Sequence, residues 1–265
     1  MKRSTYLVIV AALSLLLACA TTGPGGKKSL ILISTSQEVA IGQGMADQVA
    51  QTEKALPDSV WQSYLSEVGN RIVTVCDRKD IEYHFTVIKS DQINAFAAPG
   101  GYIYFYTGLL ERMETEAQLA AVMAHEISHV VARHGIKRLQ ASLGVALAYE
   151  LAFGDGSSEA IDQAVGVGLG LVFAGYSREN ERESDDFGFT YMVRAGYDPR
   201  GMEEMFHVLA QAGSESGSSF ERLLSSHPET QERIANARAR IGAMKPESNL
   251  ETGRERYQSM LSRLN

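Results

Sequence analysis

The segment His125-Glu126-Ile127-Ser128-His129 constrains the fold of this chain more than any other stretch. In an α-helix, residues four apart lie about 40° apart around the axis, so His125 and His129 share a face. Two imidazoles on one face can hold one metal ion, and Glu126 can then reach a metal-bound water and take its proton. The pattern predicts a helix that carries a zinc site. The alternative is two helix histidines with unrelated roles.

The residues on both sides of this motif favour a helix. The run from Glu116 to Ala124 is rich in Ala, Leu, Met, Gln and Glu, which are strong helix formers. The helix is expected to continue through His134 and to end at Gly135. His134 lies five residues beyond His129, about 140° around the axis, and is therefore predicted to face away from the metal.

The third zinc ligand is predicted to be a carboxylate on a later helix. A catalytic zinc usually takes three protein ligands and keeps one position for water. Ala132 and Gly135 stand where a metzincin would have a glycine and a third histidine, so that class is excluded. Glu181 and Asp185 are four apart, so one could bind zinc while the other orients a ligand histidine. Composition alone favours a solvated, charged helix face for the same segment.

The first residues predict an export signal with a lipid anchor. Lys2 and Arg3 precede an apolar run, residues 6–18, that is too short to span a bilayer as a stable helix. The run ends at Leu16-Leu17-Ala18-Cys19, which resembles the lipobox of bacterial lipoproteins. We therefore expect a signal peptide over residues 1–18, then lipidated Cys19 and a flexible tether to residue 35. An ordinary signal peptide is the alternative.

Charge and cysteine content exclude some classes of partner. The chain has 25 Lys and Arg against 32 Asp and Glu, a formal net charge of −7. This balance argues against nucleic acid as a partner and against electrostatic adhesion to anionic lipid. With Cys19 lipidated, Cys76 has no partner for an internal disulfide, and its apolar surroundings predict a buried thiol.

Hydrophobic periodicity predicts an α+β fold, mostly helical, with a small antiparallel sheet. Alternation predicts a strand over residues 81–89, and residues 94–98 and 102–106 are expected to form a hairpin around Pro99-Gly100-Gly101. Helical spacing predicts helices over residues 36–52, 58–76, 179–195, 200–212, 229–244 and 250–264, with a helical hairpin over 139–176.

Four further segments of the sequence accompany the motif, before and after it. They are Asn94-Ala95-Phe96-Ala97-Ala98-Pro99-Gly100-Gly101, Ser177-Arg178, Glu181-Arg182-Glu183-Ser184-Asp185, and His227-Pro228 with Arg233. Together with the motif they resemble the gluzincin metallopeptidase family that contains CAAX prenyl protease type one, HtpX and the periplasmic BepA and LoiP proteases. The likeness runs over roughly residues 36–241. Gln118 departs from the family pattern, in which an acidic residue is more usual.

The resemblance implies a zincin-like metallopeptidase domain over residues 36–244, followed by a tail over 245–265. It implies that His125, His129 and Glu181 bind one Zn²⁺ and that Glu126 is the general base. Asp185 would orient a histidine, and Arg233 would support the site from behind the ligands.

Two further segments have a functional and a structural interpretation. His227 could approach the zinc and hold an enzyme latent, or hydrogen-bond the oxyanion of peptide hydrolysis. It could also simply cap the next helix. The strand of Asn94, Ala95, Phe96 and Ala97 could pair with a substrate backbone, or be an ordinary hairpin strand.

The expected function is that of a zinc endopeptidase anchored by lipid on the periplasmic side of the outer membrane. Its expected partners are protein or peptide substrates, the membrane and outer-membrane assembly machinery, and the resemblance suggests misfolded or unassembled envelope proteins as substrates. The main alternative is a latent or non-catalytic chaperone that uses the same cleft. A hydrolase of non-peptide bonds is a weaker alternative.

Overall fold

The computed structural model describes most of the chain from residue 29 onward. The described residues are 29–144, 147, 150–151, 157–172, 174–212, 227, 230–244 and 249–264. The expected signal peptide, Cys19 and the first part of the tether lie outside them, as does Pro228.

Two capped helices begin the fold. Helix α2 (Thr35–Thr52) starts with a capping box, in which Ser34 and Gln37 satisfy each other's backbone N–H groups. Helix α3 (Ser59–Val73) starts at Asp58, whose carboxylate accepts two N–H groups of the first turn. Both helices agree with the predicted spans, since side chains able to cap stand directly before an apolar periodicity.

A three-stranded sheet follows, in the order β1-β3-β2. Strands β2 (Ala95–Ala98) and β3 (Tyr102–Tyr106) form the predicted antiparallel hairpin around the 3-10 turn η2 (Pro99–Gly101), where Gly100 has φ 77°. Strand β1 (His84–Ile88) pairs with β3 in parallel, so the sheet is mixed and the antiparallel prediction is wrong for this pair. The reason is that β2 lies at the far edge and the returning strand β3 lies between it and β1.

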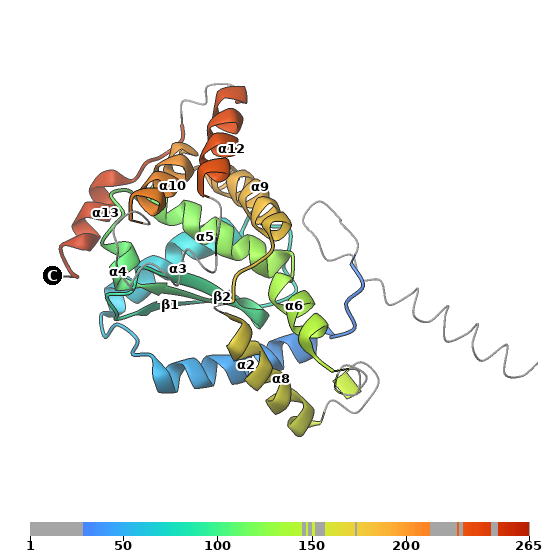
Figure 1. Ribbon diagram of the computed structural model, residues 1–265. Helices are drawn as coiled ribbons and strands as arrows, with labels where there is room; N and C mark the ends of the chain where they lie inside the picture. The colour runs from blue at the N-terminus through green and yellow to red at the C-terminus, as the bar shows by residue number, and fades with distance from the viewer. Residues whose placement is uncertain are drawn as a thin grey trace, which may run out of the picture.

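The sheet separates two apolar cores, because its side chains alternate between its faces. Ala95, Ala97, Ile103 and Phe105 belong to the larger core, which includes Trp61. Phe96, Ala98, Tyr102, Tyr104 and Tyr106 belong to the smaller core. In Figure 1 the sheet lies between α2 and α8 (Ser158–Val172) on one side and α3 and α5 (Glu116–Val131) on the other.

The remaining helices cover α5 or extend from it. They are α4 (Thr107–Leu110), α6 (His134–Ser142), α9 (Arg178–Arg194), α10 (Arg200–Ala212), α12 (Thr230–Ala243) and α13 (Arg254–Leu261). Helices α9, α10 and α12 lie on the far side of α5 from the sheet (Figure 1). The mostly helical α+β fold is thereby confirmed. None of the helices in the described residues is both long and apolar enough to cross a membrane.

The C-terminal tail packs on the larger core through α13. Tyr257 is fully buried and donates to the Leu110 carbonyl at 2.7 Å. The indole N–H of Trp61 donates to the Met260 carbonyl at 3.0 Å. Cys76, beyond the other end of α3, is buried in the same core as predicted, and it forms no disulfide within the described residues.

Candidate metal centre

Helix α5 carries the predicted motif and is held firmly at its start. The Thr115 hydroxyl accepts the N–H of Gln118, which caps the helix. The Glu116 carboxylate is buried and accepts hydrogen bonds from the hydroxyls of Tyr64 at 2.8 Å and Tyr197 at 3.0 Å. These bonds fix the first turn, and with it the direction in which the motif side chains point.

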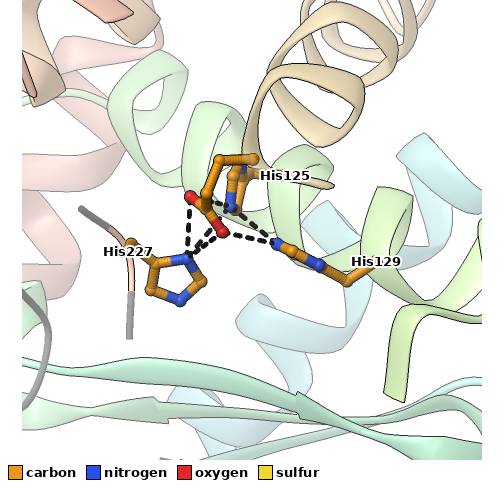
Figure 2. Close-up of side chains that lie close together, drawn as sticks. His125, His129 and His227 are labelled. Atoms are coloured by element: carbon orange, nitrogen blue, oxygen red, sulfur yellow. Dashed lines mark hydrogen bonds and ion pairs between the residues drawn. The ribbon is translucent and has the colours of Figure 1, made fainter. Parts of the chain in front are cut away.

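Four buried side chains bring their ligand atoms together at one point. His125, His129, Glu181 and His227 each offer one such atom, and these atoms all lie within 4.8 Å of one another. Figure 2 shows the three histidine rings converging on the carboxylate. The structure thus brings together the three predicted ligands, and it adds His227 as a fourth group.

The spacing within this group fits a tetrahedral zinc ion. The Nε2 atoms of His125 and His129 are 3.0 Å apart, and His227 Nδ1 is 3.3 Å from His125 Nε2. The Glu181 oxygens lie 3.0–3.5 Å from these three nitrogens. Zinc bonds of about 2.0–2.1 Å in a tetrahedron place the ligand atoms about 3.3 Å apart. Imidazole and carboxylate are also ligands that zinc accepts, so the residues fit this ion.

Helix α9 supplies Glu181 because it crosses α5 at very close range. Its N-terminus is capped by the Ser177 hydroxyl, which accepts the Asn180 N–H. Gly188 lies against the α5 backbone, and a Cβ at this position would be only 3.1 Å from the His125 nitrogen. The absence of a side chain at Gly188 lets the helices approach and places Glu181, two turns earlier, beside the histidines.

The ligand atoms are electrostatically prepared for a cation. Burial disfavours a charged Glu181, but His227, His125 and Arg233 outweigh it and hold the pKa of this carboxyl well below its usual range. Burial is the main reason that the pKa of His129 is well below its usual value. Glu181 is therefore anionic and His129 neutral at neutral pH, which are the states that bind a metal.

Asp185 lies behind His125, and Arg233 contacts both Asp185 and Glu181. His125 Nδ1 lies 2.9 Å from Asp185 Oδ1. Arg233 donates to both Asp185 oxygens, at 2.7 Å each, and its Nη1 is 3.2 Å from Glu181. Burial disfavours ionised Asp185, but Arg233 and His125 keep its pKa below the usual value. An ionised Asp185 accepts the Nδ1 proton of His125 and leaves the Nε2 lone pair to the metal.

His134 does not face away from the site, and this prediction was wrong. Helix α5 ends at Val131, Arg133 takes a left-handed conformation with φ 54°, and α6 begins at His134. The turn brings His134 Nδ1 to 2.9 Å from His129 Nδ1. Gly135, the predicted end of the helix, lies inside α6. The prediction failed because it assumed one continuous helix, and a left-handed residue other than glycine has no clear sequence signal.

Tyr176 is a site residue that the sequence analysis missed. Its ring stacks on His129, with centroids 4.1 Å apart and the planes inclined by 23°. Tyr176 stands directly before Ser177-Arg178, one of the segments that carry the family resemblance. An aromatic residue next to that segment was the sequence feature that could have identified it. The stack limits rotation of the His129 ring.

Glu126 lies beside the four-residue group but does not belong to it. Its Oε1 is 3.6 Å from His227 Nε2, while Oε2 is buried and has no hydrogen-bond partner among the described residues. A buried carboxylate oxygen without a partner is costly, and such groups are typical of reaction sites. A cavity adjoins Glu126, and its apolar lining comes mainly from α5 and α10. These residues are Leu109, Ala121, Val122, Met202, Met205, Phe206 and Leu209.

Comparisons with known proteins agree with this geometry. A family model described as Peptidase family M48 matches residues 60–241. The chain is 32% identical over 223 residues to the beta-barrel assembly-enhancing protease of Yersinia pestis, which covers 81% of the chain and 46% of that relative. It is 25% identical over 260 residues to metalloprotease YcaL of Escherichia coli (strain K12), covering 92% of the chain and 100% of the relative. It is 32% identical over 173 residues to the mitochondrial metalloendopeptidase OMA1 of Schizosaccharomyces pombe, covering 64% of the chain and 50% of that relative. The chain thus spans less than half the length of the first relative.

Proposed function

The chain belongs to Peptidase family M48, and on this basis we propose that it is a zinc-dependent endopeptidase. The observation that carries the proposal is the buried group of His125, His129, Glu181 and His227 with Glu126 beside it. His125, His129 and Glu181 would hold the metal. Zinc, when bound, would polarise the scissile carbonyl and make a water acidic enough to act as nucleophile.

The protein's own residues would then move the protons. Glu126 accepts a proton from the attacking water and delivers it to the nitrogen of the departing amine. Asp185 keeps the His125 imidazole in one tautomer and orientation, and Arg233 keeps Asp185 ionised. The apolar side chains of α10 limit water around Glu126, which strengthens each of these electrostatic interactions.

Location and substrate class belong to the same proposal. Leu16-Leu17-Ala18-Cys19 supports cleavage of residues 1–18 and lipidation of Cys19, and Ala20 after the cysteine is typical of outer-membrane sorting. The Yersinia pestis relative is named a beta-barrel assembly-enhancing protease. We therefore favour misfolded or unassembled envelope proteins as substrates, met at the periplasmic side of the outer membrane.

Metal removal tests the proposal directly. We expect the purified protein to carry a single zinc ion by elemental analysis and to cleave casein. Cleavage should stop after chelation and return when zinc is restored, because the ligand group has no other means of polarising a peptide carbonyl. Cleavage that survives complete metal removal, or a protein that takes up no zinc, would sink the proposal.

Strand β2 is positioned to hold the substrate backbone. It is an edge strand, and within the described residues it pairs only with β3. Hydrogen-bonded pairs alternate in an antiparallel ladder, and Tyr106 N–H donates to the Asn94 carbonyl. The N–H and C=O groups of Ala95 and Ala97 consequently point away from β3. Ala97 also lines the same small cavity as His129, so a strand added there would pass the metal group.

Replacing Ala97 with proline should therefore weaken substrate binding without disturbing the ladder. Proline removes an outward N–H, and edge strands tolerate this change. One lost hydrogen bond predicts a fall in kcat/KM of about fivefold to tenfold. The measurement is peptide turnover, with zinc content and thermal melting as checks on the site and the fold. Ala97→Ser keeps the N–H and is the matched control. Unchanged turnover in Ala97→Pro would remove this role for β2.

A further inference from the structure

The two histidines of the motif are supported by different partners. His125 contacts the carboxylate of Asp185 directly. His129 instead contacts a second histidine, with its Nδ1 2.9 Å from His134 Nδ1. The other ring nitrogen of His134, Nε2, lies 3.0 Å from Glu183 Oε2. A chain of two hydrogen bonds thus runs from His129 through His134 to a carboxylate, on the side of the ring away from the metal group.

The protons of this chain fit together in only one way if His129 binds a metal. An ionised carboxylate only accepts, so the proton of His134 is on Nε2 and points to Glu183. His134 Nδ1 is then an acceptor. His129 must leave Nε2 bare to bind a metal, so its own proton is on Nδ1 and needs an acceptor. His134 Nδ1, at 2.9 Å, is that acceptor.

The start of α6 and the contacts of Arg133 hold these two hydrogen bonds in place. The His134 side chain is fully buried at the start of α6, where the left-handed residue Arg133 turns it back toward α5. Arg133 is itself anchored, because its guanidinium donates to the Ile33 carbonyl at 2.8 Å and lies 2.7 Å from Glu38.

Helix α9 supplies partners to both histidines from different faces. Glu181 and Asp185 are one turn apart: Glu181 reaches the ligand atoms of both histidines, and Asp185 reaches Nδ1 of His125. Glu183 lies about 200° around the helix from Glu181 and cannot reach the metal group. It reaches His134 instead, and the turn at Arg133 is what makes this contact available. Glu181, Glu183 and Asp185 alternate along the segment, and the two faces of α9 on which they lie contact different histidines.

We propose that His134 and Glu183 are positioning residues that fix the tautomer and orientation of His129 and thereby set the metal affinity of the site. The inference rests on the proposed function only in requiring that a metal binds at His129. Partners of this kind behind metal-ligating histidines typically change metal affinity about 10-fold to 100-fold. Neither residue would touch the metal, the substrate or the reacting atoms.

Zinc affinity, measured by competition with a chromogenic chelator, tests the proposal in the full-length protein. His134→Phe keeps a planar ring but removes both nitrogens, and it should raise the zinc Kd about 10-fold to 100-fold. His134→Gln should recover much of the affinity, because its amide oxygen can accept the His129 proton. Glu183→Leu should weaken binding in the wild type but add little in the His134→Phe background, since Glu183 acts through His134. His207→Phe, at an exposed histidine of α10, is the control and should bind as the wild type does.

The outcomes separate this inference from the proposed function. If the wild type takes up no zinc, the proposed function fails. If the wild type and His207→Phe bind zinc and cleave casein while His134→Phe binds zinc equally tightly, only the inference fails. Equal losses in His134→Phe and His134→Gln would also overturn it, because packing rather than the hydrogen bond would then be responsible. Should His134→Phe not fold, Glu183→Leu carries the test, and an unchanged Kd in that variant overturns the proposal.

Discussion

Replacing Glu126 with Gln is expected to lower kcat by about 10²–10⁴ while leaving zinc in place. Glutamine has nearly the same shape but cannot accept a proton, so the proton transfer proposed for Glu126 would be lost. The ligand atoms are unaffected, because Glu126 is not one of the four residues that converge. Its Oε2 is buried and without a partner in the described part of the chain, so it is the oxygen available to accept a proton.

The matched control for this variant is Glu179→Gln. Glu179 is an exposed carboxylate on α9 and lies two residues before the predicted ligand. Glu179→Gln should keep wild-type zinc content and cleavage. The same result tests whether Glu181, and not Glu179, is the third ligand. Casein cleavage and elemental analysis on the same samples decide the result. Near wild-type cleavage by Glu126→Gln would contradict the role of Glu126 as the general base.

The local parts of the site could be predicted from the sequence because spacing along a helix fixes them. His125 and His129 share a face in any helix that contains them, and Glu181 and Asp185 do so as well. The order of the matching segments then brought the two helices together. The hairpin was predictable for a similar reason, since Pro99-Gly100-Gly101 is a strong turn signal between two apolar runs.

The parts that could not be predicted depend on contacts between distant segments. The parallel pairing of β1 with β3 depends on which hairpin strand reaches β1, and a local pattern does not carry that information. The position of His134 depends on Arg133 adopting φ 54°, and this conformation is held by Glu38 and Ile33, about 100 residues earlier. Glu183 lies about 200° around the helix from Glu181, so the two cannot both face the metal. Its contact with His134 followed only from the turn that was missed.

His227→Ala is expected to raise peptidase activity. His227 Nδ1 is 3.3 Å from His125 Nε2 and 3.0 Å from Glu181 Oε1, so it stands at the fourth corner of the ligand group. A catalytic zinc needs that corner for water or substrate. If His227 occupies it in about 90–99% of the molecules, removing the side chain should raise kcat/KM about 10-fold to 100-fold. The measurement is casein or peptide turnover at matched zinc loading.

Zinc affinity separates the two roles that His227 could have. A fourth ligand stabilises the bound metal, so His227→Ala should weaken zinc binding while it raises activity. The variants of His134 should instead weaken zinc binding and lower activity at limiting zinc, because they impair a ligand that catalysis needs. If His227→Ala lowers zinc affinity and raises peptidase activity, His227 is a group that competes with the substrate for the metal. A loss of activity in His227→Ala at full zinc loading would contradict this and favour oxyanion stabilisation, since His227 Nε2 faces Glu126 at 3.6 Å and adjoins the reaction centre.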